Sequence, residues 1–244
     1  GEYDYQLLQT GDQFLSQSGI SRNSDQTFYF DARLDWKRSF GDHNLTAMAM
    51  YMMREYRSDV LPNRNQGYSG RVTYDYASKY LVEFNFGYNG SERLAAGQRF
   101  EFFPAVSAGW VASSEKFWEP ISKYINHFKI RGSYGLVGSD AFASGAPHFL
   151  YQNNIGIGSA HKFWTGLPTS EISKQGPGFY VLAVQDAGWE HVKKFDIGFD
   201  MMLFNQLNIT FDYFHDKRER ILMSRASWPS MLGYWGSKPW SNIG

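Results

Sequence analysis

The sequence predicts an all-β protein, an antiparallel up-and-down meander of about nine strands that forms part of a larger transmembrane β-barrel. Apolar and polar residues alternate with a period of two over long segments, which is the pattern of a strand with one apolar and one polar face. These segments run for about 10–14 residues, as a tilted membrane strand requires, whereas strands of soluble proteins average about 5–6. Short turns also alternate with long loops, as they do in outer-membrane barrels.

The composition excludes several other classes. Aromatic residues make up 18% of the 244 residues, yet the total hydrophobic content is only 43% and the mean hydropathy is −0.46. Disordered chains are poor in aromatics, and a membrane helix needs about 18–20 consecutive apolar residues, a run that this sequence lacks. Lysine plus arginine balances aspartate plus glutamate at 24 each, so charge gives no reason to expect a nucleic-acid partner. The sequence contains no cysteine, which excludes disulfides, thiolate zinc sites and cysteine nucleophiles.

The alternation identifies each strand in turn. Between residues 28 and 40, Phe30 and Trp36 lie on one face, while Asp31 and Lys37 lie on the other. The same pattern recurs at 68–76, 80–88, 102–110, 128–136, 194–203 and 207–213, less regularly at 45–56, where alanine and methionine occupy both faces, and most weakly at 3–15.

The connections between these segments differ in length. Tight turns are expected at 41–44, 77–79 and 204–206, and one helical turn is expected near 113–118, before Pro120. The longer links are at about 16–25, 57–66, 89–98 and 138–189. The segment 138–189 carries no clear strand pattern, and we expect it to be one long external loop.

Periodicity alone does not distinguish a membrane wall from a soluble sandwich. Two further observations favour lipid. Charge is kept off the apolar face, where a lysine or arginine at the membrane midplane would cost roughly 2–4 kcal/mol. Aromatic side chains lie near the strand ends, as expected for girdles at both membrane interfaces. The candidates for this lipid belt are Tyr68, Tyr76, Tyr80, Tyr88, Phe102 and Trp110.

The number of strands indicates an incomplete barrel. Nine is odd, whereas bacterial single-chain barrels have an even number of strands, and an open sheet edge is not tolerated in lipid. We therefore expect residues 1–244 to form a partial transmembrane barrel, with its final strands outside this segment.

Nothing in the sequence is typical of an enzyme. The six histidines form neither an H-x-x-x-H nor an H-E-x-x-H pattern, so no metal site is expected, and no G-x-S-x-G elbow is present. Carboxylates such as Asp196 and Asp200 repeat at even spacing on a polar face, which is typical of a hydrated barrel wall, with the paired carboxylates of a glycosidase as the alternative. We expect no catalytic residue, no cofactor and no enzymatic activity.

A second group of aromatic residues falls in the long loops. Exposed rings can stack on sugars, and loops commonly carry function. The candidates for contact with a substrate or partner are Phe163, Trp164, Tyr180, Trp228, Tyr234 and Trp235, with Trp189 and Trp240 in the same regions. The alternative is that these rings pack loops together. The loop aromatics also leave a different function open, that of a secreted soluble β-protein that binds glycans through these rings.

Several longer motifs carry a family resemblance. FPAVSAGW at 103–110 is followed by SEKFW at 114–118, FKIRGSYGLVG at 128–138, GWE at 188–190, KFDIGFD at 194–200, LFNQL at 203–207 and FDYF at 211–214. In this order and spacing, the chain from about Phe28 onward resembles the later barrel strands of SusC/RagA-type TonB-dependent outer-membrane transporters.

The resemblance implies a 22-stranded barrel in the bacterial outer membrane, in contact with its lipid, that is filled by an N-terminal plug. It also implies a SusD-type surface lipoprotein as a lid, energy from the TonB complex, and import of oligosaccharides or peptides. No plug, TonB box or final strand ending in an aromatic is found in these residues. We therefore expect the contact with TonB to lie in parts absent here, and cargo specificity to lie in the loops and the plug.

Overall fold

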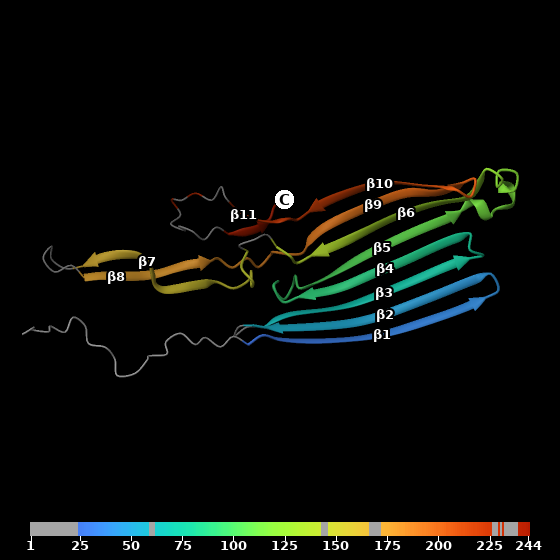
Figure 1. Ribbon diagram of the computed structural model, residues 1–244. Helices are drawn as coiled ribbons and strands as arrows, with labels where there is room; N and C mark the ends of the chain where they lie inside the picture. Colours follow the sequence, from blue (N-terminus) through green and yellow to red (C-terminus); the bar gives the residue numbers. More distant parts are fainter. Residues whose placement is uncertain are drawn as a thin grey trace, which may run out of the picture.

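The main body of the protein is one antiparallel sheet with the strand order β1-β2-β3-β4-β5-β6-β9-β10 (Figure 1). The structure, a computed structural model, describes residues 24–58, 62–142, 146–165, 172–225, 229, 231 and 239–244. The eight strands of the sheet are β1 (Gln26–Phe40), β2 (His43–Arg57), β3 (Asn63–Tyr76), β4 (Tyr80–Ser91), β5 (Phe100–Val111), β6 (Ile125–Ser139), β9 (Glu190–Leu203) and β10 (Leu207–Glu219). They coincide with eight of the nine predicted strands, which confirms the all-β meander; the predicted strand at 3–15 lies outside the described residues.

Two small sheets lie beyond one end of the main sheet (Figure 1). One pairs β7 (Asn154–Thr165) with β8 (Ile172–Val181), and the other pairs β11 (Leu222–Ser224) with β12 (Trp240–Asn242). The expectation that 138–189 lacks strands is therefore wrong. The alternation is hidden there because Gly156 and Gly176 interrupt the pattern and the pairing shifts register near Ala160.

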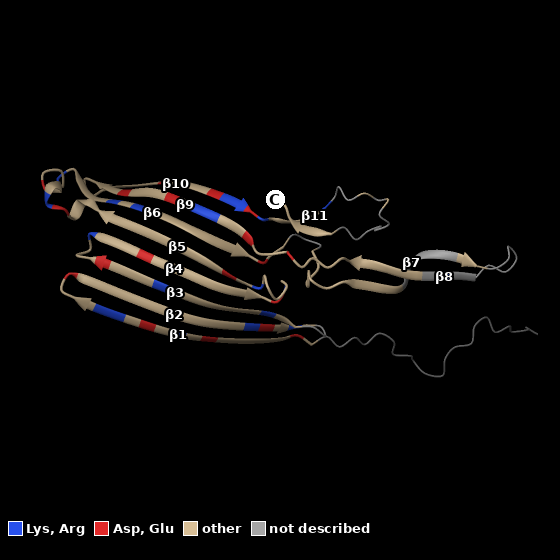
Figure 2. Ribbon diagram, turned by 180° about the vertical axis from the view of Figure 1, so that it is seen from behind, with Lys and Arg blue, Asp and Glu red and all other residues tan. Residues whose placement is uncertain are grey.

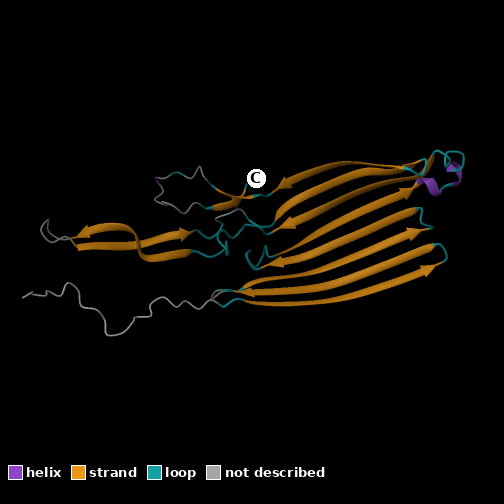
Figure 3. Ribbon diagram, viewed as in Figure 1, coloured by secondary structure: helices purple, strands orange, loops and turns teal. Residues whose placement is uncertain are grey.

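The two ends of the sheet are built differently. At one end, here called the tight-turn end, β1–β2, β3–β4 and β9–β10 are joined by short turns. The link between β5 and β6 also lies there and contains two short 3-10 helices, Ala112–Ser114 and Lys116–Trp118, where the sequence predicts one helical turn (Figure 3). The opposite end, the loop end, carries the long connections and both small sheets. Among the described residues, no helix is long and apolar enough to cross a membrane.

The register carries one face across the whole sheet. Neighbouring strands place these residues side by side: Trp36, Ala47, Val72, Phe84, Val106, Tyr134, Phe195 and His215. One position along each strand, the adjacent row reads Lys37, Thr46, Thr73, Glu83, Ser107, Ser133, Asp196 and Phe214. Since successive side chains point to opposite faces, the sheet has one apolar face and one polar face throughout.

The buried side chains gather beyond the loop end rather than on the sheet. This loop cluster consists of Leu94, Phe103, Leu150, Val184, Ala187, Trp189 and Leu222. On the apolar face, by contrast, Leu34 is 71% exposed and Phe84 42%. Within the described ranges, the apolar face therefore has no protein layer covering it.

Turn geometry provides a first prediction. The β3–β4 turn holds Ala77 and Ser78 at φ of 50° and 56°, a conformation in which a side chain is strained and for which glycine is preferred. We expect S78G to raise the free energy of unfolding of the intact protein by roughly 0.5–1 kcal/mol. Urea unfolding of protein refolded in detergent would measure it.

The β1–β2 turn supplies the matched control. Gly41 already occupies a left-handed position, at φ 58°. We expect G41A to lower the free energy of unfolding by about 1 kcal/mol, because it places a Cβ where Ser78 has one. Equal effects of S78G and G41A would contradict this account of the turns.

Candidate functional site

The register brings the six lipid-belt candidates into two rows on the apolar face. The row nearer the loop end is Tyr68, Tyr88 and Phe102, and the row at the tight-turn end is Tyr76, Tyr80 and Trp110. Each of the six is at least 36% exposed. The rows are eight residues apart, or about 27 Å along a strand. With the usual strand tilt that is roughly 20 Å across a membrane, close to the height of an apolar band.

The positions between the two rows are uncharged. On the apolar face of β3, β4 and β5 they are Gly70, Val72, Tyr74, Val82, Phe84, Phe86, Pro104, Val106 and Ala108. At the tight-turn end, the Tyr80 hydroxyl donates to Glu115 Oε1 at 2.8 Å, which is the polar contact expected of an interfacial tyrosine. These features suit a surface in contact with lipid.

The expectation that charge is kept off the apolar face holds between these rows on β3, β4 and β5, but on β1 Arg38 lies level with Tyr74 and Val82. It is also wrong toward the loop end, where Lys193 and Lys217 lie two residues from Phe195 and His215, which share the row of Val106. The charged residues found there on this face are Glu55, Arg57, Arg64, Lys193, Lys217 and Glu219. The period-two pattern did not reveal them because these residues lie at or beyond the ends of the segments in which the alternation is regular.

The polar face carries a network of ion pairs. Arg131 lies between two carboxylates, with Nε 3.4 Å from Asp200 Oδ2 and Nη2 2.8 Å from Asp212 Oδ1. The Arg71 Nε donates to Asn85 Oδ1 at 2.8 Å. Figure 2 shows lysines and arginines beside aspartates and glutamates along these strands. Asp200 and Asp212 are thus paired with a cation from a neighbouring part of the sheet, as suits a hydrated wall.

A cavity of about 490 Å³ lies along this face, lined by Thr73, Glu83, Ser107, Lys129, Arg131 and Asp196 among others. Its lining mixes hydroxyls with charges of both signs, so it can hold water and polar solutes. Among the described residues, no three histidine, aspartate or glutamate side chains are grouped to hold a metal ion.

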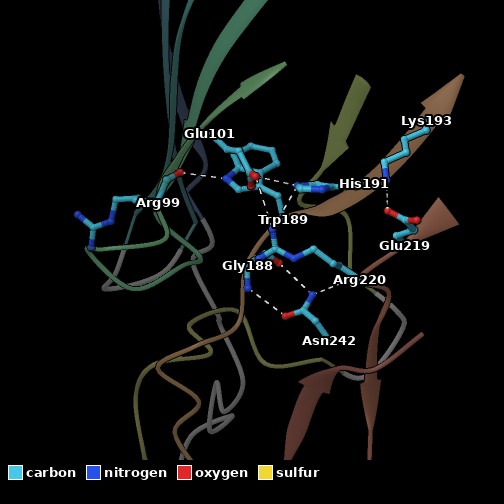
Figure 4. A network of polar contacts seen from close by, with 9 residues as sticks. All are labelled: Arg99, Glu101, Gly188, Trp189, His191, Lys193, Glu219, Arg220 and Asn242. Carbon is cyan, nitrogen blue, oxygen red and sulfur yellow. Dashed lines mark hydrogen bonds and ion pairs between the residues drawn. The ribbon is translucent and has the colours of Figure 1, made fainter. Parts of the chain in front are cut away.

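Trp189 anchors the loop cluster. It is 5% exposed, its ring meets the Phe103 ring edge-on at 5.3 Å, and its Nε1 donates to the Arg99 carbonyl at 3.1 Å (Figure 4). Trp240 packs against the same cluster. Trp189 and Trp240 thus pack loops together, which was the alternative to contact with a substrate or partner.

A polar network surrounds Trp189 and joins four segments of the chain (Figure 4). His191 Nε2 lies 2.8 Å from Glu101 Oε1, and Arg220 Nη1 lies 3.5 Å from the same oxygen. Asn242 Oδ1 accepts from the Gly188 N–H at 3.0 Å, and its Nδ2 donates to the Gly188 carbonyl at 3.1 Å. Sequence reasoning missed these residues because the partners are far apart in the chain and follow no local pattern.

The remaining loop candidates do not form one site within the described part of the chain. Phe163 and Trp164 lie in β7 and Tyr180 lies in β8, where Trp164 is 62% and Tyr180 56% exposed. The other three, Trp228, Tyr234 and Trp235, lie outside the described residues. Contact of any of these six with cargo or a partner therefore stays a prediction.

His148 links two loops at the loop end. Arg93 Nη1 donates to the Asp140 carbonyl at 2.7 Å and Arg93 Nε to the His148 carbonyl at 3.4 Å. Burial lowers the pKa of the His148 imidazole, and the positive charge of Arg93 lowers it further. The folded loops therefore favour a neutral His148.

This environment predicts acid sensitivity of the loops. As the pH falls below about 6.5, the unfolded loop takes up a proton at His148 that the folded loop resists, so folded-loop stability is lost; above that pH it is fully present. We expect the hydrogen-exchange protection of the Leu150 and Val184 amides to fall between pH 7.5 and 5.5. H148Q should remove this change, whereas H43Q, at the tight-turn end, should not; a loss that persists in H148Q would exclude His148 as its cause.

Comparison with known proteins shows what this chain is similar to. No family model matches the chain. TonB-dependent receptor P3 of Formosa agariphila is 30% identical over 157 residues, which cover 64% of this chain and 14% of the receptor. TonB-dependent receptor SusC of Bacteroides thetaiotaomicron is 28% identical over 86 residues, which cover 35% of this chain and 8% of SusC. The chain thus spans a small part of the length of the curated relatives that it matches.

A solved structure shares the fold. The structure of the RagAB peptide transporter aligns with a TM-score of 0.71 and 17% identity, over 90% of this chain and 26% of that chain. Sequence and fold together confirm the predicted resemblance: the chain is similar to part of TonB-dependent receptors that include SusC, and it shares the barrel-wall fold of the RagAB structure.

Proposed function

We propose that this chain forms part of the wall and external loops of an outer-membrane active transporter that imports glycans or peptides under a SusD-type lipoprotein lid. The observation that carries the proposal is the two-faced sheet of long strands. On β3, β4 and β5 its apolar face is free of charge between two aromatic rows, and its polar face carries the ion pairs of a hydrated wall. β1 and β10 are the edges of the sheet, and in lipid each needs a partner strand from the rest of a barrel.

The cargo and the partners rest on the relatives. SusC is named as a TonB-dependent receptor, and RagAB as a peptide transporter. We infer that peptide or oligosaccharide cargo passes on the polar side of the wall and that contact with TonB lies in parts of the protein outside this segment. The exposed Trp164 and Tyr180 project from the β7–β8 hairpin at the loop end, where cargo or the lid could meet them.

The alternative is a secreted, soluble glycan-binding protein. A soluble sandwich covers the apolar face of one sheet with a second sheet. Within the described ranges, the apolar face has no such cover, and two rows of its aromatic residues have a spacing that suits two membrane interfaces. This favours the membrane wall. We assign the segment no catalytic step, because Asp200 and Asp212 on the polar face are both engaged with Arg131.

Adjacent residues of β5 test which face meets lipid. Val106 lies midway between Phe102 and Trp110 on the apolar face, and Ser107 is its neighbour on the polar face. We expect V106R to destabilise the full-length barrel by about 2–4 kcal/mol, because it places a charge at the membrane midplane. S107R, with the same added charge, should have little effect. Heat-modifiable gel migration of detergent-extracted outer membranes measures the folded fraction.

Two outcomes would overturn the proposal. Recovery of the full-length protein in the soluble fraction without detergent would favour the secreted glycan binder. Equal tolerance of V106R and S107R would show that the apolar face does not meet hydrocarbon.

Hydrolysis of an oligosaccharide by the purified protein, lost in D200N, would overturn the assignment of no catalytic step.

A further inference from the structure

The apolar face ends in a groove at the loop end. A cavity of about 250 Å³ lies there, and Met53, Glu55, Arg64, Gln66, Gly90 and Phe100 are among its lining residues. Gly90 allows the Phe100 ring to lie across it at the edge of the groove, because a Cβ at this position would overlap that ring. The Phe100 ring also stacks on Tyr88 with the ring centroids 5.4 Å apart, so the floor of the groove continues the aromatic row nearer the loop end.

Charge is concentrated at the rim of this groove. Glu55 Oε1 lies 2.8 Å from Arg57 Nη2, and Glu55 Oε2 lies 2.9 Å from Arg64 Nε. Both arginine side chains are 53% exposed, so one carboxylate is shared by two cations that still face outward. The rim therefore carries a net positive charge.

The same arrangement recurs at the other side of the sheet. Glu219 is shared by Lys193, at 2.6 Å, and Lys217, at 2.8 Å, on the same face and at the same end. Figure 2 shows both groups near the loop ends of β2 and β3 and of β9 and β10. Four cations thus face two carboxylates along this end of the apolar face.

Depth can be counted from the tight-turn end of each strand. Gly90 lies ten residues above Tyr80 and Phe100 ten above Trp110, whereas Arg64 lies twelve above Tyr76. With about 3.4 Å per residue and a tilt near 40°, these positions are roughly 26 Å and 31 Å above the tight-turn end. An apolar band is about 25 Å tall, so the floor of the groove meets the edge of the hydrocarbon and the arginines lie among the headgroups.

We propose that this groove binds a phosphorylated glycolipid of the outer leaflet, with an acyl chain against Met53 and Phe100 and a phosphate between Arg57 and Arg64. Long loops mark the external side of such barrels, which places the groove in the outer leaflet. Arginine matches phosphate by charge and by its fork of donors, and Gln66 adds an amide at the same rim. The Lys193–Lys217–Glu219 group adds positive charge at the same end of the apolar face, but its residues do not line this groove. This inference rests on the proposed outer-membrane function.

The first test measures glycolipid bound to the full-length protein. The protein is extracted from outer membranes in mild detergent, and lipid A per barrel is quantified by mass spectrometry. We expect R57Q combined with R64Q to lower bound lipid A about tenfold, because two cations near the headgroup are lost. G90L should do the same by filling the groove without a change of charge. R71Q, on the opposite face of β3, is the matched control and should retain wild-type binding.

The second test distinguishes the glycolipid from a free anion. The wild-type protein is reconstituted in phosphatidylcholine vesicles with lipid A, with dephosphorylated lipid A, or with inorganic phosphate. Only intact lipid A should raise the unfolding temperature, and R57Q/R64Q should not respond. An equal response to inorganic phosphate or to dephosphorylated lipid A would overturn the proposal, as would unchanged lipid A binding in R57Q/R64Q.

Heat-modifiable migration separates this inference from the proposed function. If the wild-type protein shows none, the barrel assignment fails and the groove proposal falls with it. If the barrel is intact and the variants keep their glycolipid, only the groove proposal fails.

Discussion

Backbone pairing across eight long strands is the constraint on which the rest of the structure depends. In hydrocarbon, a backbone N–H or C=O has no water to bond with, so each strand must pair along its whole membrane-spanning length. Side chains alternate between the faces, so this register also decides which residues meet lipid. A slip of β4 by one residue would place Glu83 or Asn85 in the row of Val72 and Val106, on the face that carries no charge there.

The same constraint sorts side chains by depth. On β3, β4 and β5, aromatic rings mark two rows of the apolar face and the positions between the rows carry no charge, whereas charged residues lie toward the loop ends of β2, β3, β9 and β10. Arg57 and Arg64 are held by one carboxylate and still point outward, which suits a position among anionic headgroups. The polar face has no such layering, because water can reach it at every depth.

A sheet with open faces needs its protein core elsewhere, and the chain builds that core beyond the loop end. The Phe103 side chain lies on the polar face of β5 near the loops, and the Trp189 ring packs edge-on against it. Asn242 ties β12 to Gly188, and Glu101 ties β5 to His191. These contacts give the long loops a fixed base, from which the β7–β8 hairpin extends. The proposed function would use both parts: a rigid rim on the wall and projecting elements.

The sequence by itself determined the main strands, the two faces and the family resemblance, because alternation and short motifs depend on residues close together in the chain. Even so, it hid β7 and β8, since Gly156 and Gly176 break the alternation without breaking the pairing. Only the tertiary structure decided which residues build the loop cluster and the groove. Trp189 and the Arg99 carbonyl are 90 residues apart in the chain, and the ring of Phe100 covers Gly90 across a strand boundary. Such contacts follow from register and loop closure, which no local pattern encodes.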